Sequence, residues 1–188
     1  MIYTLVTAPT IRPISINDAK DYVKTSGTAD DARIQGFIDA AISYVENFTG
    51  LSLITQTWDL YIDYFPWGQI TIPKAPLQSV TSITYADSDN STQTLGTSTY
   101  TVDTDNIPGR IYLAYNKSWP GTVIKPKAVK IRFVSGYGDD GGSVPEPIRQ
   151  ALLLKVQMLY EQPINYDENA ISNAIDSLLN CYRVNYNL

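Results

Sequence analysis

The spacing of apolar side chains predicts two helices near the start of the chain. Between residues 15 and 50 these side chains recur every three or four positions, which places them on one face of a helix. Ser15 and Asp18 have the spacing of a capping box, which predicts a short first helix. The second helix is predicted to begin near Asp31 and to end at Gly50, because glycine readily adopts the left-handed conformation that ends a helix. Its apolar face comprises Ile34, Ile38, Ala41, Val45 and Phe48.

The spacing of apolar side chains changes between residues 53 and 134. There, apolar and polar side chains alternate as in a half-buried strand. Trp58 and Leu60 lie on one face of the predicted strand, which is expected to face a core. Thr57 and Asp59 lie on the opposite face, which is expected to face water. Because the connections are short and polar, we expect a mainly antiparallel sheet. After the strand at 53–65, further strands are predicted at 69–72, 79–86, 92–95, 100–103, 110–115 and 128–134.

The helical period returns after the glycine- and aspartate-rich loop 135–143. One helix is predicted to start at Pro145 and Pro147, because the first turn of a helix does not use its backbone N–H groups for internal hydrogen bonds. A last helix is predicted over residues 167–182. We therefore predict an α+β fold, in which a small helical bundle from the N- and C-terminal helices carries an inserted, mainly antiparallel β subdomain. The expected parts are an N-terminal helical part at 1–51, a β insertion at 52–143, and C-terminal helices with a tail at 144–188; the first and third form one helical body.

Composition removes most enzyme chemistry. The 188 residues contain no histidine and one cysteine, which excludes a Ser-His-Asp or Cys-His nucleophile and a histidine or thiolate metal site. We therefore predict no catalytic residue, no metal and no cofactor, and expect the protein not to be an enzyme. No segment has the basic, apolar layout of a secretion signal or approaches the roughly 20 apolar residues of a membrane span, so we expect no membrane association.

The formal net charge of −5 argues against general affinity for nucleic acid. The segment 110–132 is a local exception, because it contains six basic residues and no acidic one. The simpler interpretation of this segment is the solvated face of two strands.

Three polar motifs invite a functional interpretation that their context does not support. Gly136, Gly138 and Gly141 match a dinucleotide-binding fingerprint, but two aspartates inside the motif would repel a pyrophosphate. The segment 87–91 lacks the glycine and the glutamate that a calcium loop requires. Asp103 and Asp105 lie in a predicted turn, where aspartate is common because it hydrogen-bonds its own backbone.

Two of the three tryptophans are candidate interface residues. Trp58 has the parity of the apolar face and is predicted to lie in the core. Trp67 and Trp119 each neighbour a proline in a turn, and large aromatic side chains at exposed turns are enriched in protein–protein interfaces. Local packing is the alternative for both.

Several stretches, taken together and in order, resemble the tailed-bacteriophage head–tail connector proteins, also called adaptor or head-completion proteins, which also occur in prophages and gene transfer agents. Each stretch is short, and the resemblance covers roughly residues 15–161. The stretches are YVENFTG at 44–50, LITQTW at 53–58, PLQSVTSITY at 76–85, PGRI at 108–111, FVSGYG at 133–138 and VPEPIRQALLL at 144–154.

The resemblance implies a structural virion protein at the head–tail interface, assembled in the host cytoplasm. In this family about twelve copies form a ring beneath the portal protein, extend the DNA channel and offer a docking surface to a tail-side component. DNA passes through such a channel without specific binding, and an acidic wall would favour its passage. By position, the resemblance places portal contacts in the C-terminal segment, at Tyr182, Arg183, Tyr186 and Leu188.

A closed ring requires heterologous contacts, in which one face of a subunit meets a different face of its neighbour. The basic segment 110–132 meeting an acidic loop is one candidate for such a contact. The predicted subunit or tail interface therefore comprises Trp67, Trp119, Lys130, Asp139 and Asp140. Two alternatives remain open: another tail-side structural component, such as a tail-completion or baseplate protein, and a carbohydrate- or nucleic-acid-binding module that uses the exposed aromatic residues.

Overall fold

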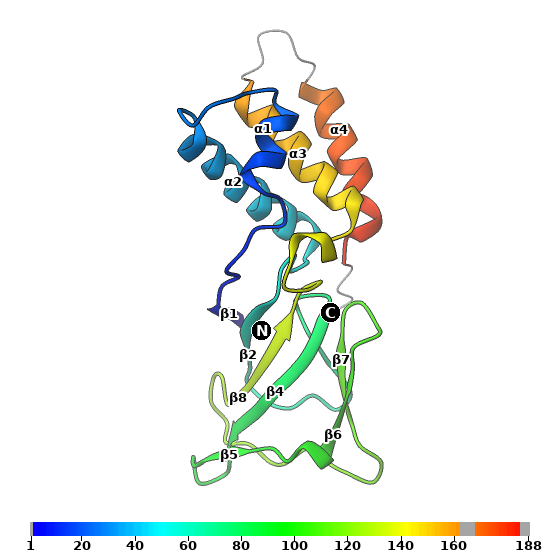
Figure 1. The fold of residues 1–188 in the computed structure, drawn as a ribbon. Helices are drawn as coiled ribbons and strands as arrows, with labels where there is room; N and C mark the ends of the chain where they lie inside the picture. Colours follow the sequence, from blue (N-terminus) through cyan, green and yellow to red (C-terminus); the bar gives the residue numbers. More distant parts are fainter. Residues whose placement is uncertain (1, 162–167, 185–188) are drawn as a thin grey trace. The chain divides into compact units, whose positions relative to one another are not determined.

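The computed structural model describes residues 2–161 and 168–184, which divide into two compact units (Figure 1). The helical unit consists of residues 10–54 together with 137–161 and 168–184. The β unit consists of residues 2–9 and 55–136. The prediction of an α+β fold with a mainly antiparallel sheet is confirmed. None of the described helices is long and apolar enough to span a membrane.

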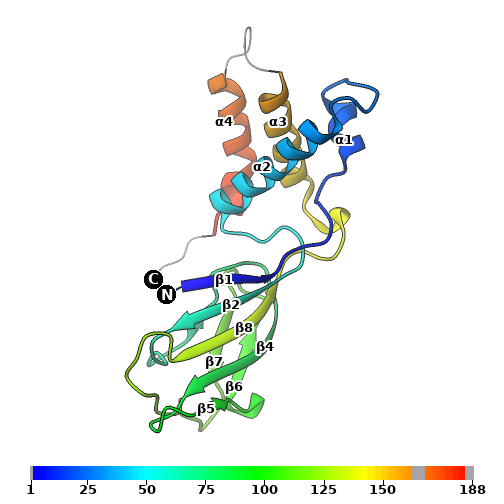
Figure 2. The same cartoon turned by 90° about the vertical axis from the view of Figure 1, so that its left-hand side faces the viewer.

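Four helices form the helical unit: α1 (Ile16–Tyr22), α2 (Asp31–Thr49), α3 (Glu146–Tyr160) and α4 (Glu168–Leu179). Helix α3 packs against both α2 and α4, and α1 contacts α2 and α3 (Figure 2). The predicted capping box of Ser15 and Asp18 is present, and Gly50 ends α2 with a φ of 77°. The contacts between helices bury an apolar core contributed by Ile34, Ile38, Ala41, Val45, Ile148, Ala151, Leu152 and Val156.

Two antiparallel sheets enclose the core of the β unit. The larger sheet has the order β1-β2-β8-β4-β5, with bounds Ile2–Thr7, Gln56–Ile62, Val129–Ser135, Leu77–Ala86 and Thr92–Thr94 respectively. The smaller sheet has the order β3-β7-β6, with bounds Ile70–Thr71, Arg110–Leu113 and Tyr100–Asp103. The two sheets share one apolar cluster around the fully buried Phe133, and β6 and β7 lie behind β8 and β4 in Figure 2.

The N-terminal strand β1 departs from the sequence prediction, which assigned residues 1–51 to the helical part. Residues 2–7 instead pair antiparallel with β2 and add an edge to the larger sheet. The segment is rich in aromatic and β-branched residues but has no helical periodicity, so a strand is the element that it favours. Residues 137–143, predicted to belong to the β insertion, group with the helical unit.

Asp59 corrects the prediction that one face of β2 is wet. Its side chain is 6% exposed and accepts two hydrogen bonds of 2.8 Å from the guanidinium of Arg132, on the neighbouring strand β8. This bidentate contact holds the pKa of the Asp59 carboxyl below its ordinary value. A carboxylate can therefore be buried at this polar position because its partner strand supplies the matching cation.

Candidate functional site

The C-terminal segment is anchored to the end of helix α2. After α4 a short 3-10 helix, Asn180–Tyr182, leads to Val184, which is buried and donates its N–H to the Thr49 carbonyl at 2.8 Å. The Arg183 guanidinium is exposed and lies 5.5 Å from the centre of the Phe48 ring. Of the four predicted portal contacts, Tyr182 and Arg183 therefore lie on a fixed part of the helical unit, whereas Tyr186 and Leu188 lie outside the described residues.

Tyr182 lies close to a second tyrosine of the helical unit. It is half-buried and contributes, together with Cys181, to the electrostatic surroundings of Tyr137. Burial is the main reason that the pKa of Tyr137 rises to about 12. The Tyr137 phenol therefore stays neutral near pH 7, and the described end of the C-terminal segment presents one cation, Arg183, beside the Phe48 ring.

The two candidate tryptophans occupy different environments within the β unit. Trp67 is fully exposed. Trp119 is half-buried and stacks on Phe65, with ring centres 4.9 Å apart and planes 2° apart. Its indole N–H donates to the Gly68 carbonyl at 3.3 Å, which ties the turn around Trp67 to the 115–127 loop. In the isolated chain, Trp119 is thus a packing residue that positions the turn, while Trp67 is free for a partner.

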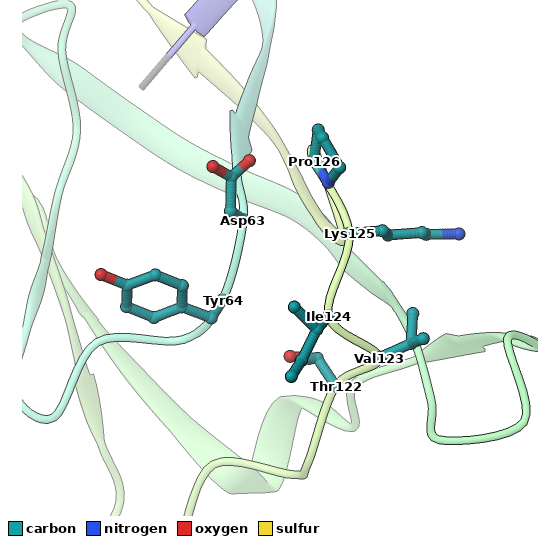
Figure 3. A pocket seen from close by; sticks show the side chains of 7 residues that line it. All are labelled: Asp63, Tyr64, Thr122, Val123, Ile124, Lys125 and Pro126. Carbon is teal, nitrogen blue, oxygen red and sulfur yellow. The ribbon is translucent and has the colours of Figure 1, made fainter.

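Two adjacent clefts lie on the same loops. The first has a volume of about 390 Å³ and lies between the segment of Asp63 and Tyr64 and the segment 122–126, which carries Ile124 (Figure 3). The second has a volume of about 440 Å³ and lies between the turn 64–67 and residues 117–122. Tyr64 and Thr122 line both clefts. The alternation along residues 53–65 places Tyr64 on the apolar face of the strand, but the strand ends at Ile62 and Tyr64 is exposed. No pattern pointed to Ile124, because parity along a strand says nothing about side chains in a loop.

The six basic residues of segment 110–132 do not form one cationic patch. Arg132 is bound to Asp59, Lys127 lies 5.3 Å from the Tyr61 ring centre, and the Lys125 ammonium donates to Asn90 at 2.5 Å. Lys130 is half-exposed on β8 and makes no ion pair with any residue of the described ranges 2–161 and 168–184. Arg110, on β7, also makes no ion pair with a described residue, so Lys130 and Arg110 are the strand cations of this segment that could meet a neighbouring chain.

The predicted acidic partners, Asp139 and Asp140, lie together in the helical unit but differ in their contacts. The Asp140 carboxylate accepts hydrogen bonds of 2.9 Å from both the N–H and the hydroxyl of Ser143, so it caps the 3-10 helix Gly141–Ser143. Asp139 is exposed. The carboxylate of Asp140 therefore has a structural role already, and Asp139 is the better candidate for a contact with another chain.

The glycines of the same loop have packing roles. A Cβ at Gly138 would lie 2.6 Å from the Ser143 hydroxyl, and one at Gly141 would lie 2.5 Å from the Pro13 carbonyl oxygen. Only glycine fits such close approaches. Gly138 and Gly141 are therefore explained by the packing of this loop, whereas Gly136 has a positive φ of 138°.

The remaining acidic motifs are turns. The Asp87 carboxylate accepts hydrogen bonds from the side-chain amide of Gln93 and from the N–H groups of Ser91 and Asp89, which together hold its pKa below the ordinary value. Asp103 accepts from the N–H of Asp105 in the same way. Within the described ranges, no cluster of three or more histidine, cysteine, aspartate or glutamate side chains is arranged to hold a metal ion.

Comparison with known proteins agrees with this arrangement. A family model described as head completion protein matches residues 13–184. The fold is similar to chains in three solved structures: the neck of an empty GTA particle computed with C6 symmetry, the virion of a native gene transfer agent particle, and the neck of a native GTA particle computed with C12 symmetry. The TM-scores are 0.84, 0.82 and 0.81, each at 23% identity and covering 100% of this chain and 98% of the other. A search of curated proteins finds no match.

The class that these observations define is an α+β protein with a helical body and an inserted antiparallel β unit. The chain belongs to the head completion protein family. Membership makes it a structural protein of the head–tail junction of a phage-like virion, as the resemblance of its sequence implied.

Proposed function

We propose that this chain is a non-enzymatic connector subunit, about twelve copies of which form a ring beneath the portal protein and extend the DNA channel toward the tail. The observation that carries the proposal is the family match over residues 13–184. Fold similarity over the whole chain supports it, since two of the similar structures are particle necks computed with C6 and C12 symmetry. Rings of this kind are closed by heterologous contacts.

The ring can be tested by measuring the mass of the purified chain in solution, alone and mixed with the matching portal protein, by light scattering and negative-stain microscopy. We expect closed rings, either of the chain alone or on the portal. A chain that stays monomeric and ignores the portal would overturn the proposal, and would favour a tail-completion or baseplate component instead.

The portal contact is proposed for the C-terminal segment, at Tyr182, Arg183, Tyr186 and Leu188. The anchoring of Val184 on the Thr49 carbonyl supports it, because the segment would start from a fixed point of the helical unit. Removing residues 185–188, or changing Arg183→Glu, should abolish portal binding in a pull-down. Arg33→Glu provides a control elsewhere on the helical unit, and equal loss in that control would refute a specific contact.

The subunit contact is proposed between Lys130 of one copy and Asp139 of the next. Lys130→Glu should weaken assembly at low salt, and the added change Asp139→Lys should restore it. The matched control is Lys24→Glu, which alters net charge by the same amount. A ring that assembles equally well with Lys130→Glu would contradict this contact.

The channel wall is proposed to be acidic and to come from the helical unit. By sequence, residues 10–54 and 137–184 contain thirteen acidic and seven basic side chains, whereas the rest of the chain contains six and seven. An acidic wall would let DNA pass, because no counterions are released by pairing with phosphates. A ring in which Lys125, Lys127 and Lys130 line the channel would contradict it.

A further inference from the structure

The loops after β2 and before β8 expose large apolar side chains around the two clefts. Tyr64, Trp67, Tyr115 and Ile124 are 69%, 102%, 92% and 103% exposed, and we call this set the loop face. Such a concentration of exposed aromatic and aliphatic side chains beside shallow clefts is unusual for a surface that stays in water. The loop face therefore has the character of a binding surface rather than of a solvated loop.

The clefts are built to receive apolar groups and are held in shape by internal contacts. The stacked pair Phe65 and Trp119 lines the second cleft, and the hydrogen bond from Trp119 to the Gly68 carbonyl holds the turn that carries Trp67. In the first cleft, Tyr64 and Ile124 lie on the two segments that form its walls, while the Lys125 side chain extends away (Figure 3). A partner would find these clefts largely preformed.

The charges around the clefts favour an acidic partner. Lys117 lines the second cleft and Lys125 the first. The anion that lines the first cleft, Asp63, already accepts the backbone N–H of Lys127 at 2.7 Å. The segment 110–132 contains no acidic residue, although the chain as a whole is acidic. The second cleft thus has one cation, Lys117, and no acidic residue beside an apolar lining, which is the complement of a peptide with an apolar anchor and an acidic flank.

A protein fits the loop face better than a nucleic acid. Single-stranded nucleic acids need several free cations for the backbone and open aromatic faces for the bases. Of the nearby lysines, Lys125 is bound to Asn90 and Lys127 lies over Tyr61, and one face of Trp119 is already covered by Phe65. The apolar clefts, in contrast, match the anchoring pockets found at the centres of protein interfaces.

We propose that the loop face binds an acidic segment of a second protein, which inserts an apolar side chain into a cleft and places a carboxylate against Lys117. The inference goes beyond the ring and does not depend on it, because the loop face is formed within one β unit.

The test uses the full chain as bait for a displayed library of random peptides. We expect enriched sequences that combine aspartate or glutamate with an aromatic or branched aliphatic residue. The double variant Trp67→Ala with Ile124→Ala should weaken binding of an enriched, synthesised peptide at least about tenfold. Ile107→Ala, which removes another exposed isoleucine of the β unit, is the matched control and should bind as well as wild type.

Charge is tested separately. Lys117→Glu should weaken the same peptide about tenfold, and raising the ionic strength from about 0.05 M to about 0.5 M should weaken binding to the wild-type chain. Failure to enrich acidic sequences, equal loss with Ile107→Ala, or binding of a thymidine oligonucleotide that Trp67→Ala abolishes would each overturn the proposal. Light scattering of the same variants tests ring assembly independently of peptide binding. We expect the loop-face variants to assemble like wild type even where they lose the peptide.

Discussion

The two units of the chain place their large apolar side chains differently. Among the described residues, eleven large hydrophobic side chains are exposed, and ten of them lie in the β unit. The exception is Ile11, at the start of the helical unit. The helical unit instead uses its apolar stripe for internal packing and carries an excess of acidic side chains on its surface. The two units therefore present different surfaces: nearly all exposed large apolar side chains of the described residues lie in the β unit, whereas most acidic residues belong by sequence to the helical unit.

The largest expected effect concerns the core of the β unit. Phe133→Ala should lower the free energy of unfolding by about 3–5 kcal/mol, because Phe133 is fully buried between the two sheets. All three tryptophans lie in the β unit, so urea unfolding followed by fluorescence reports on it. Ile124→Ala, at a fully exposed site, should change stability by less than about 0.5 kcal/mol. Equal losses of unfolding free energy in the two variants would contradict the assignment of Phe133 to the core and of Ile124 to the exposed loop face.

The next effect concerns the buried carboxylate of the β unit. Asp59→Asn should cost about 1–3 kcal/mol at pH 7, since it weakens a charge-assisted pair of which Arg132 is partly exposed. The pKa of Asp59 is lowered in the folded state, so the stabilisation is complete above its unfolded value of about 3.9 and is lost as the pH falls through the folded value.

Urea unfolding at several pH values checks this prediction. The difference between wild type and Asp59→Asn should shrink as the pH falls below about 4. Asp89→Asn, in an exposed turn, is the control and should differ from wild type by less than about 0.5 kcal/mol. A difference for Asp59→Asn that stays constant from neutral to acidic pH would contradict the ion pair.

The third effect compares two tryptophans of the β unit, Trp119 with a packing role and Trp67 with a proposed binding role. Trp119→Ala should destabilise the β unit by about 1–2 kcal/mol, because it removes the stack on Phe65 and the bond to Gly68. Trp67→Ala should leave stability within about 0.5 kcal/mol of wild type. Thermal unfolding followed by circular dichroism measures both, and a larger loss for Trp67→Ala than for Trp119→Ala would reverse their assigned roles.

The smallest effect distinguishes two neighbouring aspartates of the helical unit. Asp140→Ala should cost about 1 kcal/mol, since it removes the cap of the 3-10 helix at Ser143. Asp139→Ala should cost less than about 0.5 kcal/mol and should affect only assembly. Chemical unfolding and light scattering on the same two variants provide the check, and equal losses of stability would show that the two carboxylates are equivalent.

The regular elements could be predicted from the sequence because their periods are local. The apolar stripe of α2, its end at Gly50, and the strands on either side of the turns at 87–91 and 105–109 all follow from spacing and turn residues. Burial of Asp59 could not be predicted in the same way, because its partner Arg132 is 73 positions away in sequence. Strand β1 was missed because an edge strand exposed on both faces has no alternating pattern.

The candidate interface was predictable only in part. The proline-flanked turns drew attention to Trp67 and Trp119, but the stack that separates their roles joins residues far apart in the sequence. The exposure of Ile124 and Tyr64 depends on how two loops lie beside each other, which no local pattern encodes. The assignment of Asp140 as an interface residue overlooked a competing local role, since aspartate commonly caps short helices.

The measurement that tests the central claim most directly is electron microscopy of particles assembled without this chain. If the chain is the connector of the head–tail junction, heads and tails should form separately and remain unjoined, and adding the purified chain should restore joined particles. Particles that join their tails equally well without the chain would contradict the account.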